Sequence, residues 1–438
     1  MSESESEPEV NLDGKVSVPL LPLELTVNLM ETPITTITFF EGDYTDAADY
    51  LRTRVVEIVY RNPWLGGWLA QDPKTKETRL WYDPSSDDFA PGIFHVFEPG
   101  QIPLSREASY DTCYELVKLH GAKVRHNNDL IGKNEAIFKI AIIPDELNPS
   151  NRFSLVTSMS HIGGDKHTYY QIFNMLYKGT AIWAMNPNRK MEVIQAAFDR
   201  MGQKESFYFR NATNEPMWKA PKFKEDIDPM QLKIFFLRPE WLDHRKQQQE
   251  YVRSEESHPT SRQSDYALLA SWFFRLVNAK VGLLAFNFRN FLDGCDLNDT
   301  DAGNYQNPIP LTPVDYLTPR LVQQALDSGK RCGTDPIASL PLFHNENSCS
   351  IAIDWAESKD AALDIGGTCE ETLHVPLYSS KELRSIHNKL SFMVMFTASG
   401  KTADHSRRGG LFVVAAKSIM AKIEECGIVE EMIYFEDK

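Results

Sequence analysis

The sequence predicts a mixed α/β (α+β) fold, and three observations support this prediction. Segments with strand and helix patterns are mixed along the chain without a repeated period, which argues against a solenoid. The chain has 438 residues, enough for two or three domains or for one large two-lobed body, and a chain of this length buries about 75% of the surface that its unfolded form exposes. Its composition is 42% hydrophobic and 24% charged, as in an ordinary globular protein, so wholesale disorder is excluded.

Charge and cysteine usage limit the partners and the compartment. The net charge is −15, and a field of this sign repels phosphate backbones, so we expect no nucleic-acid partner. None of the six cysteines forms a C-x-x-C pair, which suits a reducing, cytoplasmic compartment better than a disulfide scaffold or a zinc ribbon. Residues 1–14 are acidic, and we expect them to form a disordered tail. They lack the basic start and apolar stretch of a secretory signal, so we do not expect export. No apolar run reaches the ~20 residues of a membrane helix, so we expect no membrane span.

The first half of the chain predicts a helix followed by strands. We expect order from about Val16 and a helix from residue 45, which Pro63 ends before a strand begins. Residues 136–143 and 153–159 are predicted to form buried strands. A helix follows them, with Asp165 at its N-cap position. Its apolar stripe consists of Tyr169, Ile172, Phe173 and Leu176.

The second half predicts further strands and helices after a long connection. Residues 186–231 contain proline and lysine and show only weak periodicity, so we expect a connection there. Strands are predicted at 234–237, 282–288, 350–356, 393–396 and 411–415. Helices are predicted from Pro239, over 266–277 and over 416–426. Residues 298–313 are predicted to form a loop because they contain Gly303, Pro308 and Pro310.

The segment with the clearest chemical character is residues 158–165, Ser-Met-Ser-His-Ile-Gly-Gly-Asp. A predicted buried strand delivers His161 to its C-terminal end, Gly163 and Gly164 permit a sharp turn, and a helix begins at Asp165. Histidine titrates near neutrality, so it can take a proton from an alcohol or amine and return it to a leaving group. A tight turn between rigid elements can hold the imidazole in one direction. His161 is therefore a candidate general base.

Two other interpretations of this segment stay open from the residues alone. His161 could be a hydrogen-bonded core histidine, with Asp165 serving only as a helix cap. A metal loop of the H-x-H-x-D-H type would also need histidines where Gly163 and Lys166 stand, so we expect no metal here.

Eight short segments, taken in their order along the chain, form a recognisable series. They are residues 39–42, 62–67, 161–165 (an HxxxD pattern), 264–275, 287–289, 303–304, 354–356 and 364–367. In order and spacing they resemble the acyl-CoA-dependent acyltransferases of the chloramphenicol-acetyltransferase-like superfamily, particularly the BAHD type. The resemblance covers roughly residues 16–430.

This resemblance implies two similar lobes, each a mixed sheet with helices, with His161 in a solvent channel between them. Residues 15–185 would form the N-terminal lobe, 186–231 the crossover and 232–438 the C-terminal lobe. The implied reaction transfers an acyl group from acyl-CoA to a hydroxyl or amine of a small molecule without an acyl-enzyme. Acyl-CoA would be a co-substrate rather than a permanently bound cofactor, and the protein would be a monomer.

The resemblance also assigns supporting roles. Asp165 would point away from the channel and pair with Arg289, which would lock the turn that contains Gly164 and His161. Asp364 and Gly366 match a structural element of the family. Because an acidic protein that binds CoA needs local positive charge, Lys219, Lys222 and Lys224 are candidates for the CoA phosphates, although a solvated loop explains them equally well.

Three departures from the family pattern keep other functions open. Lys166 stands where glycine is usual, Asn287 replaces an aspartate, and the DFGWG element has become Asp-Ile-Gly-Gly-Thr at residues 364–368. A non-catalytic ligand-binding or regulatory protein of the same fold is therefore the main alternative. A condensation domain acting on carrier-bound thioesters is another, but such domains usually carry a second histidine where Ser160 stands.

Overall fold

The computed structural model describes residues 14–26, 32–85, 90–202, 205–206, 228–254, 263–333, 349–356, 362–367, 369–381, 383, 390–398 and 408–432. Residues 1–13 of the expected tail and much of the expected crossover lie outside these ranges, as do the candidate lysines Lys219, Lys222 and Lys224.

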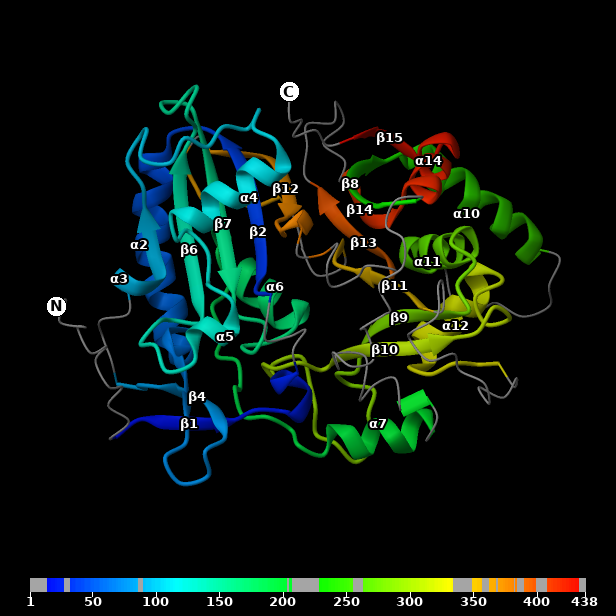
Figure 1. The fold of residues 1–438 in the computed structure, drawn as a ribbon, viewed down its shortest axis with the longest axis horizontal. Coiled ribbons are helices and arrows are strands. Elements are labelled where there is room, and N and C mark those ends of the chain that lie inside the picture. The colour runs from blue at the N-terminus through cyan, green and yellow to red at the C-terminus, as the bar shows by residue number, and fades with distance from the viewer. Residues whose placement is uncertain are drawn as a thin grey trace.

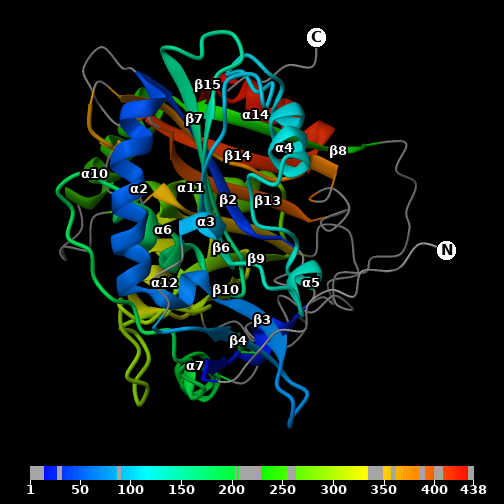
Figure 2. The same cartoon turned by 90° about the vertical axis from the view of Figure 1, so that its left-hand side faces the viewer.

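The first lobe is built on a five-stranded mixed sheet in the order β12-β2-β7-β6-β5 (Figure 1). Its strands are β2 (Ile34–Glu41), β5 (Phe94–Val96), β6 (Phe138–Pro144), β7 (Arg152–Met159) and β12 (Glu370–Pro376). Strand β5 runs parallel to β6, and the other neighbours are antiparallel. Helix α2 (Tyr44–Arg61) lies on the face of this sheet that is turned away from the second lobe, and it stands at the left in Figures 1 and 2.

The predicted end of α2 is confirmed. Pro63 begins a 3₁₀ turn, η2 (Pro63–Gly66), and the chain turns into strand β3 (Trp68–Gln71). With β1 (Val16–Pro19) and β4 (Thr78–Tyr82), β3 forms a small sheet in the order β1-β4-β3. The remaining helical segments are η1 (Pro22–Leu25), α3 (Ala90–Ile93), α4 (Tyr110–Leu119), α5 (Asn127–Leu130), α6 (Lys166–Asn174) and α7 (Val193–Met201).

The second lobe is built on a seven-stranded mixed sheet in the order β10-β9-β11-β13-β14-β8-β15. Its strands are β8 (Met230–Leu237), β9 (Val281–Asn287), β10 (Gln306–Leu311), β11 (Cys349–Asp354), β13 (Ser391–Ala398), β14 (Arg408–Ala416) and β15 (Val429–Met432). Its helices are α10 (Pro239–Ser254), α11 (Asp265–Leu276), α12 (Pro319–Ser328) and α14 (Lys417–Glu425).

The prediction of a loop over residues 298–313 was wrong in part. Residues 306–311 form β10, which pairs antiparallel with β9 even though it contains Pro308 and Pro310. A sheet tolerates proline on an edge strand because the missing N–H can face away from the neighbouring strand. Strand β10 is such an edge strand, so its prolines are compatible with a strand and do not require the predicted loop.

The C-terminal half of the chain contributes one strand to the first sheet. Strand β12 lies beyond residue 232, in the expected C-terminal lobe, but it pairs antiparallel with β2 in the first sheet. The expected division into residues 15–185 and 232–438 does not include this contributed strand. The lobes are therefore not separated at a single point in the sequence.

The second sheet is buried on both faces, and its side chains alternate between two cores. Val394 and Phe412 belong to the apolar cluster of the first lobe, whereas their neighbours Met393 and Leu411 belong to the cluster that contains α11. This period of two is the ordinary consequence of a pleated strand. The second sheet therefore packs against both apolar clusters and joins the lobes. The predicted mixed α/β fold is confirmed.

Candidate active site

His161 lies in the turn that joins β7 to α6, as predicted. The backbone N–H of Ser160 donates to the Ile137 carbonyl at 2.7 Å, and Gly163 N–H donates to the Ser160 carbonyl at 2.8 Å. A side chain at Gly164 would place its Cβ 2.5 Å from the Cβ of Thr168, so only glycine fits there without a shift. Close packing against the first turn of α6 therefore fixes the loop that carries His161.

The amide of Asn304 defines which nitrogen of His161 carries the proton. Asn304 Nδ2 lies 2.8 Å from the His161 carbonyl oxygen and 2.9 Å from Glu24 Oε1, and both of these atoms can only accept. Asn304 Oδ1 must therefore be the atom 2.9 Å from His161 Nδ1, and it accepts the proton of Nδ1. This leaves a lone pair on Nε2, which has no hydrogen-bond partner among the described residues.

The environment keeps this imidazole neutral. Burial lowers the pKa of His161 from the ordinary value of 6.5, and the negative charges of Asp165 and Glu24, together with the hydrogen bond to Asn304, oppose this shift only in part. The residue is nevertheless partly exposed rather than fully enclosed. A neutral ring with a free Nε2 is the form that a general base requires.

Asp165 is the last residue of the turn and is fully engaged in hydrogen bonds. It caps α6 by accepting from the backbone N–H of Thr168 at 3.1 Å. Its Oδ2 accepts from Arg289 Nη1 at 2.9 Å and from the backbone N–H groups of Tyr305 and Gln306 at 2.8 and 2.9 Å. Burial alone would raise the pKa of Asp165, but the charge and hydrogen bond of Arg289, helped by His167 and the Thr168 N–H, lower it to about 2. Asp165 is thus an anion at neutral pH, and its hydrogen bonds join the first turn of α6 to Arg289.

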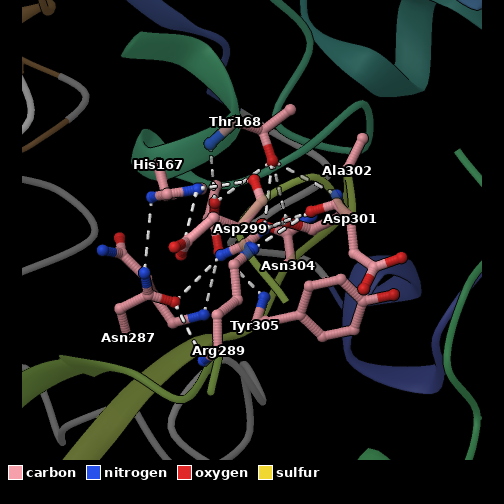
Figure 3. Close-up of polar contacts among 12 residues, drawn as sticks. His167, Thr168, Asn287, Arg289, Asp299, Asp301, Ala302, Asn304 and Tyr305 are labelled. Carbon is pink, nitrogen blue, oxygen red and sulfur yellow. Dashed lines mark hydrogen bonds and ion pairs between the residues drawn. The ribbon is translucent and has the colours of Figure 1, made fainter. Parts of the chain in front are cut away.

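The Arg289 side chain is fully buried, and Figure 3 shows it among Thr168, Asp301 and Tyr305. Besides Asp165, its guanidinium donates to Thr168 Oγ1 at 3.1 Å and to the carbonyls of Asp301 and Gly303 at 3.0 Å. The ring of Tyr305 lies 4.9 Å from it in a cation–π contact. The pairing expected between Asp165 and Arg289 is present, and it ties the start of α6 to the segment after β9.

Asn287 occupies the position where the resemblance expects an aspartate. Its Oδ1 accepts from Arg289 Nη1 at 3.0 Å and from the Arg289 backbone N–H at 3.2 Å. The amide oxygen thus supplies the acceptor, and the Asn287 side chain faces His167 on α6 at 3.4 Å, as Figure 3 shows.

Asp364 and Gly366 lie elsewhere. Asp364 accepts from the backbone N–H of Gly366 at 2.8 Å, and its carbonyl accepts from Lys178 N–H at 2.8 Å. Gly366 has a φ of 85°, a conformation that favours glycine. Among the described residues, none of these hydrogen bonds reaches His161 or Asp165, so this turn supports the chain beyond α6 rather than the imidazole.

Sequence reasoning missed Glu24 and Arg189 and gave Asn304 no role. The Glu24 carboxylate is buried and accepts from Arg189 Nε at 3.0 Å and from Asn304. Arg189 also donates to the Ile162 carbonyl, in the His161 turn, at 2.7 Å. One signal was available: Glu24 interrupts an apolar stretch at residues 20–25, and a buried carboxylate needs a partner.

A separate cavity of about 350 Å³ lies in the second lobe. Residues of α10, α11, β13 and β14 line it, including Lys246, Tyr266 and Arg408. None of its lining residues belongs to the His161 turn.

No protein-family model and no curated protein matches this sequence. Solved structures, however, match nearly the whole chain. The first condensation domain of the CDA synthetase is 13% identical with a TM-score of 0.56, and the match covers 95% of this chain and 95% of that one. Vinorine synthase is 14% identical with a TM-score of 0.53, covering 96% of this chain and 99% of its own. TRI101 of F. sporotrichioides, solved with coenzyme A and T-2, is 12% identical with a TM-score of 0.54, covering 95% and 100%.

The chain has the two-lobed chloramphenicol-acetyltransferase-like fold. At these identities the likeness concerns the fold, which acyltransferases and condensation domains share. In the described part of the chain, no helix is both long and apolar enough to cross a membrane.

Proposed function

We propose that this protein transfers an acyl group from acyl-CoA to a hydroxyl or amine of a small-molecule acceptor, with His161 as the general base. The observation that carries this proposal is the Asn304 amide, which leaves the lone pair of His161 Nε2 free. The likeness in fold to TRI101, solved with coenzyme A, supports the choice of donor.

The reaction follows from this geometry in two steps. His161 Nε2 takes the proton of the acceptor O–H or N–H while the acceptor atom attacks the thioester carbonyl carbon. The resulting tetrahedral oxyanion collapses, the C–S bond breaks, and the departing CoA thiolate takes the proton back from Nε2. No covalent acyl-enzyme forms. Acid–base assistance of this kind contributes about 10²–10⁴-fold, and the rest would come from holding both substrates together.

The fold also supports a second candidate donor. The match to the condensation domain of the CDA synthetase is as good as the match to TRI101, so a carrier-bound thioester could replace acyl-CoA. Ser160, buried beside His161, stands where such domains usually carry a second histidine, which favours acyl-CoA. A non-catalytic role remains the alternative if neither donor reacts.

The test incubates the purified protein with a panel of acyl-CoAs and of alcohol and amine acceptors and measures the release of free thiol. Acceptor-dependent release is expected, and we expect His161→Ala to lower the rate by about 10²–10⁴-fold. His95→Asn, on β5 away from the site, is the control and should match the wild type. Wild-type rates in folded His161→Ala would exclude the mechanism, and release only from an acyl-carrier protein would favour the condensation reaction.

A further inference from the structure

Glu24 is a buried, heavily engaged carboxylate that the proposed acyl-transfer steps do not use. Its side chain has no solvent exposure and lies in η1, near the start of the chain. Oε1 accepts from Asn304 N at 3.1 Å and from Asn304 Nδ2 at 2.9 Å, and Oε2 accepts from Leu21 N at 2.8 Å. Arg189 Nε lies 3.0 Å from both oxygens.

These contacts hold Asn304 by its backbone and by its side chain at once. With both of its N–H groups directed at one carboxylate oxygen, Asn304 is held with Oδ1 facing His161 Nδ1 at 2.9 Å. A continuous chain of hydrogen bonds thus runs from the Glu24 carboxylate through the Asn304 amide to the imidazole. A negative charge at one end polarises each bond along such a chain and stabilises positive charge at the other end.

Glu24 is not the only charged group near the ring. Asp165, paired with Arg289, caps the start of α6, whereas Glu24, paired with Arg189, accepts from the Asn304 amide. Each carboxylate is paired with its own arginine. The difference between them is the route to the imidazole, since Glu24 alone is connected to Nδ1 through a side-chain amide.

From this geometry we infer that Glu24 is a positioning residue for His161, acting through Asn304 to hold the imidazole with its proton on Nδ1 and to strengthen Nε2 as a base. The inference deepens the proposed function and rests on it for its catalytic consequence. Its structural part, the state of the His161 ring, can be measured without any turnover.

The first experiment observes the ring directly in the full-length protein. Nitrogen NMR of protein carrying ¹⁵N-labelled histidine, with His161 assigned by the loss of its signals in His161→Ala, reports the tautomer and the pKa. We expect the wild type to carry its proton on Nδ1. Glu24→Gln keeps an acceptor oxygen but removes the charge, so the pKa of His161 should fall. Glu24→Ala removes the acceptor, so a detectable fraction of the ring should move its proton to Nε2.

The second experiment measures acyl transfer by the same variants. We expect Glu24→Ala to lower kcat by about 10–100-fold, part of the full contribution of a general base, while KM changes by less than about threefold. Glu57→Ala and Glu57→Gln are matched controls, since Glu57 is an exposed carboxylate on α2 paired with Arg54. Both controls should leave the His161 signals and the rates unchanged.

The outcomes separate this inference from the proposed function. Because Glu24→Ala leaves several buried donors without an acceptor, it can fail to fold, and Glu24→Gln then decides. A folded Glu24→Gln with the tautomer and pKa of the wild-type His161 would overturn the inference, even if its activity were reduced. If the wild type transfers no acyl group from any donor, the proposed function fails, whereas the NMR result still decides the role of Glu24.

Discussion

The proposed chemistry of this site depends on the neutral form of one residue, His161. Burial lowers its pKa below 6.5, so the ring is already unprotonated at neutral pH and Nε2 is available to accept a proton. A solvent-facing histidine, with a pKa near 6.5, would begin to take up a proton at a higher pH than this buried ring does. The pH dependence of the reaction should therefore report on this ring.

We predict that kcat/KM is constant near neutral pH and falls as the pH decreases through a value below 6.5. The sign follows because protonation of Nε2 at low pH removes the base. Initial rates across an acidic to neutral series, with a donor and acceptor found active, measure this profile. An acidic limb centred above 6.5 would contradict the assignment of His161 as a buried base.

In contrast to His161, Asp165 is held in its charged form, because its folded-state pKa is lowered from 3.8 to about 2. A lowered carboxyl pKa adds stability that is present above about pH 3.8 and is lost as the pH falls towards 2. Asp165→Asn leaves Arg289 buried without its anion, so we predict a loss of about 3–5 kcal/mol in the free energy of unfolding at neutral pH.

Urea denaturation at neutral pH and at about pH 3 tests this, since the difference between wild type and Asp165→Asn should shrink on acidification. Activity should fall as well, through displacement of the His161 turn. Equal stability of the two proteins at neutral pH would show that the Asp165–Arg289 pair does not hold the turn.

At the scale of elements, the junction between β7 and α6 places the imidazole. Strand β7 ends at Met159 and α6 begins at Lys166, so only six residues connect a buried strand to a capped helix. The connection is this short because Gly164 allows the loop to lie against Thr168. The position of His161 is thus a product of backbone packing as much as of its own hydrogen bonds.

Gly164→Ala should therefore destabilise the protein by about 1–3 kcal/mol and lower kcat, because the new methyl group overlaps Thr168. Gly92→Ala is the matched control, since a Cβ at that position would meet no atom within 4 Å. Thermal unfolding and initial rates measure both effects. A Gly164→Ala protein as stable and active as Gly92→Ala would mean that the turn relaxes freely.

At the scale of the whole molecule, the first lobe depends on strand β12, which comes from the second half of the chain. Strand β12 completes the edge of the first sheet next to β2, and its residues Leu373 and Val375 are buried in the first-lobe core. A fragment of residues 1–185 would expose both the backbone of β2 and the apolar surface that β12 covers. Unpaired, apolar edges favour aggregation.

We predict that a 1–185 fragment expressed alone is aggregated or lacks cooperative unfolding, and that the intact chain unfolds in one transition. Circular dichroism with urea as denaturant distinguishes the cases. A soluble fragment that unfolds cooperatively would show that the first lobe is an independent domain, as a division at residue 185 expects.

The sequence by itself determined the local features of this protein. The apolar stripe and Asp165 predicted α6, Pro63 predicted the end of α2, and the order of short segments predicted the mixed two-lobed fold. Each of these depends on residues close together in the chain or on a resemblance of pattern. The edge prolines of β10 show the weakness of such reasoning, because whether a strand lies at the edge of a sheet is not a local property.

Only the tertiary structure decided which distant residues support His161. Glu24 and Asn304 are 280 positions apart, and β12 pairs with β2 across more than 300 residues. No periodicity links such positions, because burial selects them in three dimensions: a carboxylate, an arginine and an amide can enter the interior only where each meets the others. The candidate base was visible in the sequence, whereas the residues that define its protonation became visible only in the folded chain.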